Sequence, residues 1–196
     1  MHEIERICVF AGSSPGRRPE YLTAARALGR AIADERIGLV YGGAGVGLTG
    51  AVADAVLDRG GSVVGVMPRA LVEREVAHAG LTELRVVGSM HERKAEMADL
   101  ADAFVALPGG LGTLEEMFEM LTWAQLGHHA KPCGLLNVAG YYDRMLSMMD
   151  HAVEERFVAP EHRAMLLVDA EPGPLIERFR TYRAPQVSKW LNREEP

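Results

Sequence analysis

The sequence predicts an α/β protein: a Rossmann-like open parallel sheet with helices on both faces, in a single domain. Short apolar runs rich in β-branched residues recur along the 196 residues, and segments with apolar residues at helical spacing separate them. Most of the runs are largely apolar rather than alternating with polar residues. Strands of this kind, alternating with helices, are typical of a parallel sheet that is covered on both sides.

Seven apolar runs are expected to form the strands. They cover residues 6–12, 36–43, 61–68, 83–88, 103–110, 133–138 and 165–169. Helical spacing between them predicts three amphipathic faces. These are Tyr21, Ala25, Leu28 and Ile32; Leu114, Met117, Phe118 and Leu121; and Tyr142, Met145, Met149 and Val153. We expect one domain over residues 1–183 and a polar C-terminal tail over 184–196.

Composition excludes several classes of partner. The net charge is −6 and no basic block occurs, which argues against nucleic-acid or membrane-surface binding. No apolar run approaches the ~20 residues of a membrane span, and the N-terminus lacks the features of a signal peptide, so a cytoplasmic location is expected. Cys8 and Cys133 lie in apolar runs and are expected to be buried, inert thiols.

Three turns rich in glycine or serine follow predicted strands, at residues 11–16, 41–50 and 107–113. In open parallel sheets, ligands bind beyond the carboxyl ends of the strands, where such turns meet. Backbone N–H groups and a helix N-terminus at a turn attract anions. Three such turns on one edge indicate a phosphorylated ligand.

The second turn contains the spacing Gly45-x-Gly47-x-x-Gly50, which matches the dinucleotide fingerprint. That fingerprint requires an acidic residue at the end of the next strand, and the strand at 61–68 ends without one. NAD binding is therefore rejected, and tight helix–strand packing accounts for most of these glycines. The seven histidines form no HExxH motif. No cofactor and no metal are expected.

The third turn allows two interpretations. Thr113 and Glu116 have the spacing of a capping box, in which Glu116 would only support the start of a helix. Glu115, Glu116 and Glu119 also suit the positive end of a helix dipole. Alternatively, Glu116 is a catalytic acid beside a phosphate-binding turn. Spacing alone does not decide between them.

The segment 88–97 favours the catalytic interpretation. Ser89 and Glu92 form another capping box, which places Arg93 and Lys94 in the early turns of a helix. Cations at that end oppose the helix dipole, so an anion nearby is expected to balance them. The two segments can then supply N–H donors, cations and a carboxylate to one phosphorylated ligand.

MHERKAEM at 90–97, together with LPGGLGTLEE at 107–116, resembles the paired signature of the Lonely Guy (LOG) family of cytokinin riboside 5′-monophosphate phosphoribohydrolases. The likeness covers most of the chain in the family's order. It includes VFAGSS, YGGAGVGLTGAVADAVL, VVGVMP, TWAQLGHHAKPCGLLN and YYDRML. Departures are minor: Ala44 replaces a frequent glycine, and Thr49 a frequent methionine.

This resemblance implies hydrolysis of the N-glycosidic bond of an adenine-type nucleoside 5′-monophosphate, giving ribose 5-phosphate and adenine or a prenylated cytokinin base. It makes Arg93 and Glu116 the catalytic pair, and it also implies a homodimer. The apolar content of segments 114–126 and 141–153 fits a dimer. The residues expected to bind the small-molecule nucleotide substrate are Ser13, Ser14, Gly43, Lys94, Pro108, Gly109, Gly110, Gly112 and Thr113.

Two other functions remain open. A nucleosidase acting on AMP would use the same site. A non-catalytic carrier of a nucleotide or of molybdenum cofactor would use the glycine turns for binding alone. Glu116 discriminates between catalysis and carriage, because a carrier has no need of a carboxylate beside its phosphate loop.

Overall fold

The computed structural model describes residues 3–73 and 77–185. One seven-stranded sheet forms the centre of the molecule, and every neighbouring pair of strands is parallel. The strands are β1 (Arg6–Phe10), β2 (Gly38–Tyr41), β3 (Val63–Pro68), β4 (Glu83–Val87), β5 (Ala103–Ala106), β6 (Cys133–Leu136) and β7 (Leu166–Asp169). Each lies inside a run that the sequence predicted as a strand, so the predicted fold class is confirmed.

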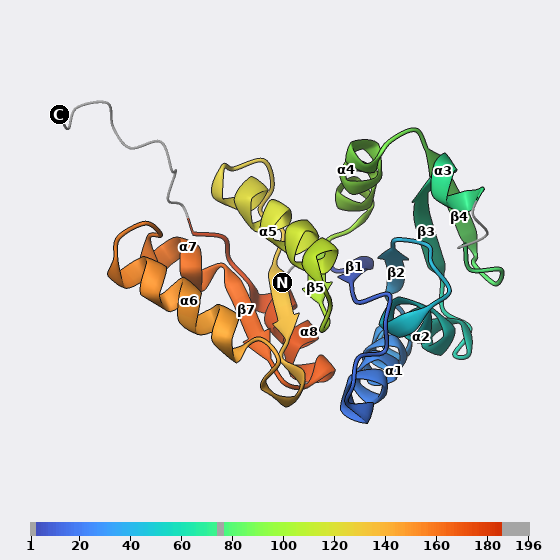
Figure 1. Ribbon diagram of the computed structural model, residues 1–196, viewed down its shortest axis with the longest axis horizontal. Coiled ribbons are helices and arrows are strands. Elements are labelled where there is room, and N and C mark those ends of the chain that lie inside the picture. Colours follow the sequence, from blue (N-terminus) through green and yellow to red (C-terminus); the bar gives the residue numbers. More distant parts are fainter. Residues whose placement is uncertain (1–2, 74–76, 186–196) are drawn as a thin grey trace.

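Helices connect successive strands and cover both faces of the sheet (Figure 1). They are α1 (Pro19–Asp34), α2 (Gly47–Leu57), α3 (Arg69–Val72), α4 (Met90–Leu100), α5 (Leu111–Gln125), η1 (Val138–Gly140), α6 (Asp143–Glu154), α7 (Pro160–Ala164) and α8 (Pro172–Thr181). Within the described residues, no helix combines the length and apolar character that a membrane crossing requires. Of the predicted tail at 184–196, only residues 184–185 lie within the described part of the chain.

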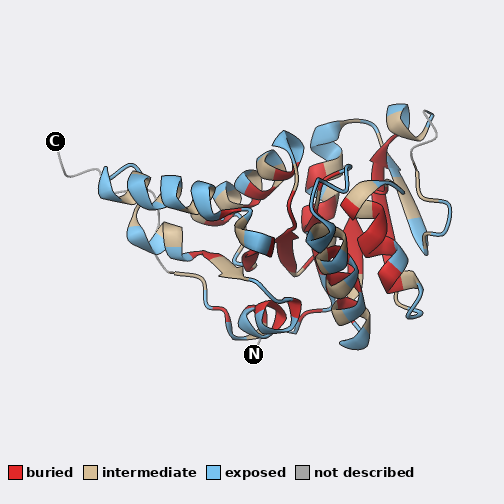
Figure 2. Cartoon of the chain, turned by 60° about the horizontal axis from the view of Figure 1, so that its bottom comes forward, coloured by how far each residue is buried: buried red, intermediate tan, exposed pale blue. Residues whose placement is uncertain are grey.

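Two hydrophobic cores lie on opposite faces of the sheet. Figure 2 shows buried residues concentrated in the strands and on parts of the helices. Ile7 and Val9 of β1 belong to the core beneath α1, α2 and α8. Cys8 and Phe10 alternate with them and belong to the core beneath α4 and α5. Since both faces are covered, nearly all residues of the central strands are buried, and the exceptions Arg6 and Gly38 are the first residues of β1 and β2. This explains why the strands read as continuous apolar runs.

The predicted helix faces are borne out to different degrees. In α1, Ala25, Leu28 and Ile32 are fully buried, as their spacing predicts. In α5, Met117 is buried but Phe118 is 40% exposed, so the placement of Phe118 in the core is wrong. Met120 takes that place, because the buried stripe of α5 runs through residues 117, 120 and 124.

Strand order places the functional edge. The order is β4-β3-β2-β1-β5-β6-β7, so the chain winds outward from β1 to β4 and then returns to continue from β5. β1 therefore lies between β2 and β5, and Val9 is in register with both Tyr41 and Val105. Ligands bind open parallel sheets at such a switch of winding direction.

Cys8 and Cys133 are both buried free thiols, as predicted. Burial raises the pKa of Cys133 to about 12. Burial also raises the pKa of Cys8, and the nearby carboxylate of Glu116 adds to the effect. Neither thiol is a reactive thiolate at neutral pH.

Candidate active site

The three glycine-containing turns lie against one another at the carboxyl ends of β1, β2 and β5. In the first turn, the N–H of Gly12 donates to the carbonyl of Pro108 in the third turn at 3.1 Å. The N–H of Leu48, in the second turn, donates to the carbonyl of Gly12 at 2.9 Å. The prediction that these turns share one edge is confirmed, and backbone hydrogen bonds join the three turns to one another.

Two glycines permit this packing because they lack a Cβ. A Cβ on Gly47 would lie 2.2 Å from the carbonyl carbon of Ser13, and its φ of +62° disfavours any side chain. A Cβ on Gly109 would lie 2.1 Å from Oγ1 of Thr113 and 2.9 Å from the nitrogen of Gly12. Gly47 and Gly109 are therefore packing requirements of the turns.

The start of α5 differs from the predicted capping box. The helix begins at Leu111 with Gly110 as its N-cap, and Thr113 is already its third residue. The Thr113 side chain is buried against Gly109 and does not cap the helix. The capping-box interpretation of Thr113 and Glu116 is therefore wrong, because glycine supplies the cap one turn earlier.

The first turn of α5 is open at two positions. Nothing lies within 4 Å of the place where a Cβ would stand on Gly110 or Gly112. The first N–H groups of a helix have no partners within the helix, and they attract an anion. Pro108, Gly109, Gly110, Gly112 and Thr113 thus lie together around one open helix N-terminus.

The other predicted binding residues lie on the first two turns. Ser13 and Ser14 are exposed, and Oγ of Ser14 accepts a hydrogen bond from the N–H of Gly16 at 3.3 Å. Gly43 has a φ of +83°, and its carbonyl accepts from the N–H of His78 at 2.8 Å. All three therefore lie on turns that contact or neighbour the start of α5.

Helix α4 brings the predicted cations to the site. Oγ of Ser89 accepts from the N–H of Glu92 at 3.1 Å, and Oε2 of Glu92 accepts from the N–H of Gly88 at 2.8 Å. The predicted cap of α4 is therefore confirmed. It fixes Arg93 and Lys94 in the second turn, and both side chains reach carboxylates of α5.

Backbone groups hold the Arg93 side chain in place, and we call the space that they form, between Gly42 and the carbonyl of Val66, the seat of Arg93. Its Nε donates to the carbonyl of Val66, which lies within β3, at 3.1 Å. Its Nη2 lies 1.8 Å from the position that a Cβ on Gly42 would occupy, so only glycine leaves room for the guanidinium there. Nη2 also lies 3.6 Å from Oε1 of Glu116. The side chain is 15% exposed.

Glu116 projects from α5 into this nearly enclosed position, where its side chain is 12% exposed. Burial raises the pKa of its carboxyl above the ordinary value, and the adjacent guanidinium of Arg93 opposes that rise. Glu115 and Glu119 raise the pKa further, while Lys94 lowers it. A carboxylate with a raised pKa and a fixed cationic partner is typical of catalytic sites.

Lys94 is buried between two carboxylates. Its Nζ lies 2.5 Å from Oε1 of Glu115 and 2.9 Å from Oε2 of Glu119, and the side chain is 8% exposed. Burial opposes the charge of the ammonium, but the hydrogen bonds to Glu115 and Glu119 outweigh it and raise the pKa of Lys94. The ammonium is therefore charged and forms ion pairs with both carboxylates.

Several contributors were missed at the level of sequence. The hydroxyl of Tyr141 donates to the carbonyl of Gly109 at 2.5 Å, and the Tyr141 ring packs edge-on against Tyr21. The seat of Arg93 uses Gly42 and the carbonyl of Val66. A paired glycine directly after a strand is a signal that could have indicated Gly42, whereas a backbone carbonyl leaves no mark in a sequence.

Among residues 3–73 and 77–185, no group of three or more histidine, cysteine, aspartate or glutamate side chains is arranged to hold a metal ion. The ionisable groups around Glu116 are instead a mixture of cations and carboxylates that pair with one another.

Solved structures share the architecture at low sequence identity. The molybdenum cofactor binding protein of Rippkaea orientalis superposes with a TM-score of 0.69 over 92% of this chain and 98% of its own, at 23% identity. The molybdenum cofactor carrier protein of Chlamydomonas reinhardtii also gives 0.69, at 19% identity, over 92% of this chain and all of its own. At these identities the likeness concerns the fold alone.

Sequence relatives are much more similar. A family model described as "Possible lysine decarboxylase" matches residues 49–179. The probable cytokinin riboside 5′-monophosphate phosphoribohydrolase LOGL9 of Oryza sativa subsp. japonica is 52% identical over 177 residues, which are 90% of this chain and 78% of the relative. The Arabidopsis thaliana cytokinin riboside 5′-monophosphate phosphoribohydrolase LOG7 is 50% identical over 91% of this chain and 82% of its own. With this coverage, and with the paired motifs assembled at one edge of the sheet, the chain belongs to the Lonely Guy (LOG) family.

Proposed function

We propose that this protein hydrolyses the N-glycosidic bond of adenosine-type 5′-monophosphates, plain or N6-modified, to the free base and ribose 5-phosphate. One observation carries the proposal: the buried carboxylate of Glu116 is paired with Arg93 beside the open N-terminus of α5. The relatives at about half identity are named for this reaction on cytokinin riboside 5′-monophosphates.

The reaction develops positive charge on the sugar. As the bond between C1′ and the base nitrogen breaks, its electron pair leaves with the base, and the ribose takes on oxocarbenium character. Glu116 stabilises that charge or accepts a proton from the attacking water. The water oxygen bonds to C1′, and the proton that water gives up is passed on to the departing base nitrogen. General base action contributes ~10²–10⁴-fold, and preorganised charge can add as much.

Arg93 keeps Glu116 ready for this role. Because burial favours the neutral carboxylic acid, an isolated Glu116 would lose the charge that the reaction needs. The guanidinium 3.6 Å away lowers the pKa of Glu116 and offsets part of the effect of burial. The hydrogen bond to Val66 and the space above Gly42 hold the guanidinium in that place.

The 5′-phosphate remains intact and serves as a handle. We place it at the N-terminus of α5, where Gly110 and Gly112 leave open space and Gly109 and Thr113 complete the turn. Ser13, Ser14 and Gly43 lie on the turns beside it. Binding energy from this remote group orients the sugar over Glu116, which raises the rate of the chemical step.

Two other activities fit the site less well. Lysine decarboxylation, the description of the family model, would require a free amine for a Schiff base, yet Lys94 is held as an ammonium by two carboxylates. Carriage without catalysis leaves a buried, partly destabilised carboxylate unexplained. A carrier has no use for the raised pKa of Glu116 next to its phosphate loop.

We also propose that the protein is a homodimer. The two segments with high apolar content correspond to α5 and α6, and each keeps a large apolar residue on the outside: Phe118 is 40% exposed and Met148 is 65% exposed. Leu111, beside the open helix N-terminus, is 86% exposed. Covering these residues with a second copy would also shield the site from water.

Incubation with AMP and with N6-isopentenyl-AMP, followed by chromatography of the released base, tests the proposed reaction. We expect adenine or N6-isopentenyladenine, together with ribose 5-phosphate, without added metal or redox cofactor. Faster turnover of the prenylated substrate would favour cytokinin release over AMP salvage. Absence of base from both substrates, or complete loss of turnover in EDTA, would contradict the proposal.

A further inference from the structure

We propose that Lys94, Glu115 and Glu119 form a charge clamp between α4 and α5 that positions Glu116 for the reaction, so that Lys94 is a positioning residue rather than a ligand of the phosphate. This inference rests on the proposed function, because it assigns a role to groups next to the catalytic pair. It differs from the phosphate contact that the sequence predicted for Lys94.

The clamp links the two helices that carry the catalytic pair. Lys94 follows Arg93 directly on α4, and Glu116 lies between Glu115 and Glu119 on α5. The ammonium binds one carboxylate on each side of Glu116 along the helix, at 2.5 Å and 2.9 Å. A slide of α4 along α5 would have to stretch these two short contacts as well as the 3.6 Å contact between Arg93 and Glu116.

The surroundings of Lys94 do not suit a phosphate ligand. The Lys94 side chain is 8% exposed, and the Glu119 side chain beside it is 23% exposed. Two carboxylates around one ammonium give that cluster a net charge of −1. A phosphate dianion would have to displace at least one carboxylate and add its own negative charge to the other.

The clamp also sets the electrostatic environment of Glu116. The charged and titratable groups that affect the Glu116 carboxyl are Arg93 and Lys94 from α4 and Glu115 and Glu119 from α5, and Cys8 of β1 is coupled to it. Lys94 favours the ionised form, whereas Glu115 and Glu119 oppose it. Removal of the cation and removal of one carboxylate should therefore shift the pKa of Glu116 in opposite directions.

The first variant is Lys94→Met, which keeps the length and apolar stem of the side chain. We expect kcat to fall by about 10–100-fold, as a displacement of catalytic groups by about 1 Å would produce. KM for AMP should change little. The ratio of kcat/KM for AMP to that for adenosine should be unchanged, because the phosphate site is intact. The acid limb of kcat/KM should move to higher pH.

Glu119→Gln is the second variant, and it is milder because Glu115 still pairs with Lys94. Its acid limb should move to lower pH. Lys131→Met is the matched control: its ammonium also holds α4, by donation to the carbonyl of Ala98 at 2.7 Å, but at the other end of the helix. We expect that control to change stability without moving the pH profile.

Titration of the Glu116 carboxyl carbon by NMR, in the native chain and in both clamp variants, is a readout that needs no turnover. Opposite shifts of its pKa support the clamp; unchanged values overturn it. A loss confined to AMP in Lys94→Met, with adenosine turnover untouched, would return Lys94 to the phosphate. If the two variants show opposite pKa shifts but the native protein releases no base, the proposed function is refuted and the clamp is still supported.

Discussion

At the scale of single residues, Glu116 shows a conflict between folding and function. Burial of a carboxyl favours its neutral form, and the pKa of Glu116 is raised for this reason first. Arg93 lowers the pKa of Glu116 again and so favours its ionised form, which the proposed oxocarbenium ion would need. Ionised Glu116 therefore lowers the stability of the protein, because this carboxylate is poorly solvated even beside Arg93.

Replacement of Glu116 by glutamine tests this conflict. In the folded protein a raised pKa means that ionisation opposes folding, so the stability contributed by this group falls as pH rises from its ordinary value of 4.5 through the folded pKa. At pH 7 the neutral amide avoids that cost. We expect Glu116→Gln to lower kcat by at least ~10²-fold. Its melting temperature at pH 7 should equal or exceed that of the native protein.

Thermal unfolding at pH 4 and pH 7, combined with single-turnover base release, measures both parts of this prediction. The stability gain should be larger at pH 7 than at pH 4, where the native carboxyl is more protonated. Retained turnover in the folded variant would show that Glu116 is not catalytic. A variant that is less stable at pH 7 than at pH 4, relative to the native chain, would contradict the direction of the pKa shift.

At the scale of elements, the residue after β2 has no side chain, and this absence makes room for Arg93. The chain leaves β2 through Gly42, and the guanidinium of Arg93 occupies the space where a Cβ would stand. The carbonyl of Val66 within β3 supplies the second contact. The position of the guanidinium is therefore set by backbone just after β2 and within β3, while the residue itself comes from α4.

Gly42→Ala should displace Arg93 with modest harm to the fold. A Cβ there would lie 1.8 Å from Nη2 of Arg93, but the guanidinium is the flexible end of a long side chain and can move away. We expect a stability loss of about 1–3 kcal/mol, the usual range for overpacking, and a fall in kcat of ~10²-fold. Steady-state kinetics with AMP and urea unfolding measure the two effects.

Gly173→Ala is the matched control, because a Cβ at Gly173 would meet nothing within 4 Å. It should keep the activity of the native chain. If Gly42→Ala were equally active, the position of Arg93 in that seat would be unimportant for catalysis.

The positions of the strands could be predicted from the sequence better than the start and the orientation of helix α5. The strands inside the sheet could be located because burial on both faces makes each one a nearly continuous apolar run. The edge strand β4, which contains Glu83 and Arg85, is only partly buried. The start of α5 was placed wrongly because Thr113-x-x-Glu116 matches a capping box, while the actual cap is a glycine without a side-chain signal. Helical spacing alone could not tell Phe118 from Met120, since it gives the width of an apolar stripe but not its orientation on the sheet.

At the scale of the whole molecule, the site depends on the return of the chain at β5. Strands β1 and β5 are neighbours in the sheet although about 90 residues of sequence separate them. The sequence predicted that three turns share an edge, and this followed from parallel topology alone. The contacts between Arg93, Gly42 and Val66 could not be predicted, because they depend on the distances between strand ends and helix α4.

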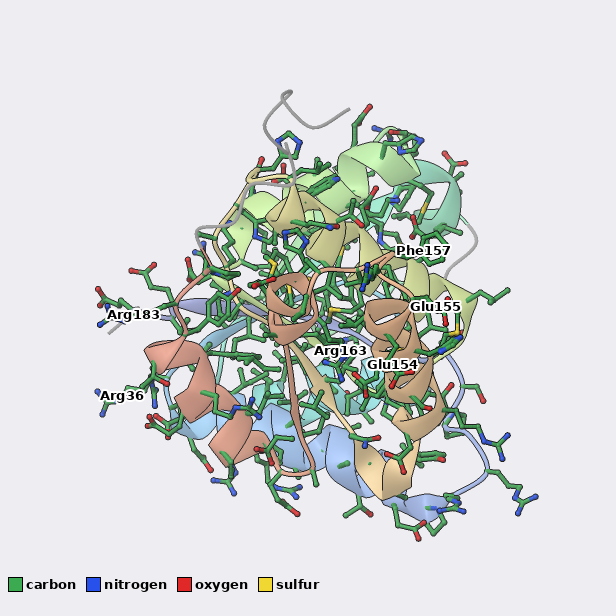
Figure 3. The ribbon with its side chains drawn as sticks, turned by 90° about the vertical axis from the view of Figure 1, so that its left-hand side faces the viewer. Arg36, Glu154, Glu155, Phe157, Arg163 and Arg183 are labelled. Carbon is green, nitrogen blue, oxygen red and sulfur yellow. The ribbon has the colours of Figure 1, made fainter. Side chains whose placement is uncertain are left out.

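The dimer is also a property of the whole molecule. We expect light scattering to give twice the mass of a single chain at micromolar concentration, and Phe118→Asp to give the mass of one chain, because a buried unpaired charge at an interface is costly. Phe157→Asp is the control: this residue is 87% exposed beside Glu154 and Glu155, at the end of the molecule formed by α6 and α7 (Figure 3), and lies outside both proposed interface segments. A native monomer, or loss of the dimer only in the control, would contradict the proposed interface.

The phosphate requirement tests the assembled edge of the sheet. Three turns meet there, and the open start of α5 offers N–H groups that a neutral nucleoside does not need. Charge-assisted hydrogen bonds contribute roughly 1.5–3 kcal/mol each, and 1.4 kcal/mol corresponds to a factor of ten. Loss of two or three should therefore make kcat/KM for adenosine on the order of 10³-fold or more below that for AMP.

Part of this loss should appear in kcat, because the energy of the bound phosphate orients the sugar over Glu116. Steady-state kinetics on the two substrates measure the split, with inorganic phosphate added to the adenosine reaction as a separate test. Partial rescue of adenosine turnover by phosphate would show that a phosphate bound at the turns assists the reaction even when it is not joined to the sugar. Comparable kcat/KM values for AMP and adenosine would mean that the glycine turns serve packing alone and that the reacting nucleotide binds elsewhere.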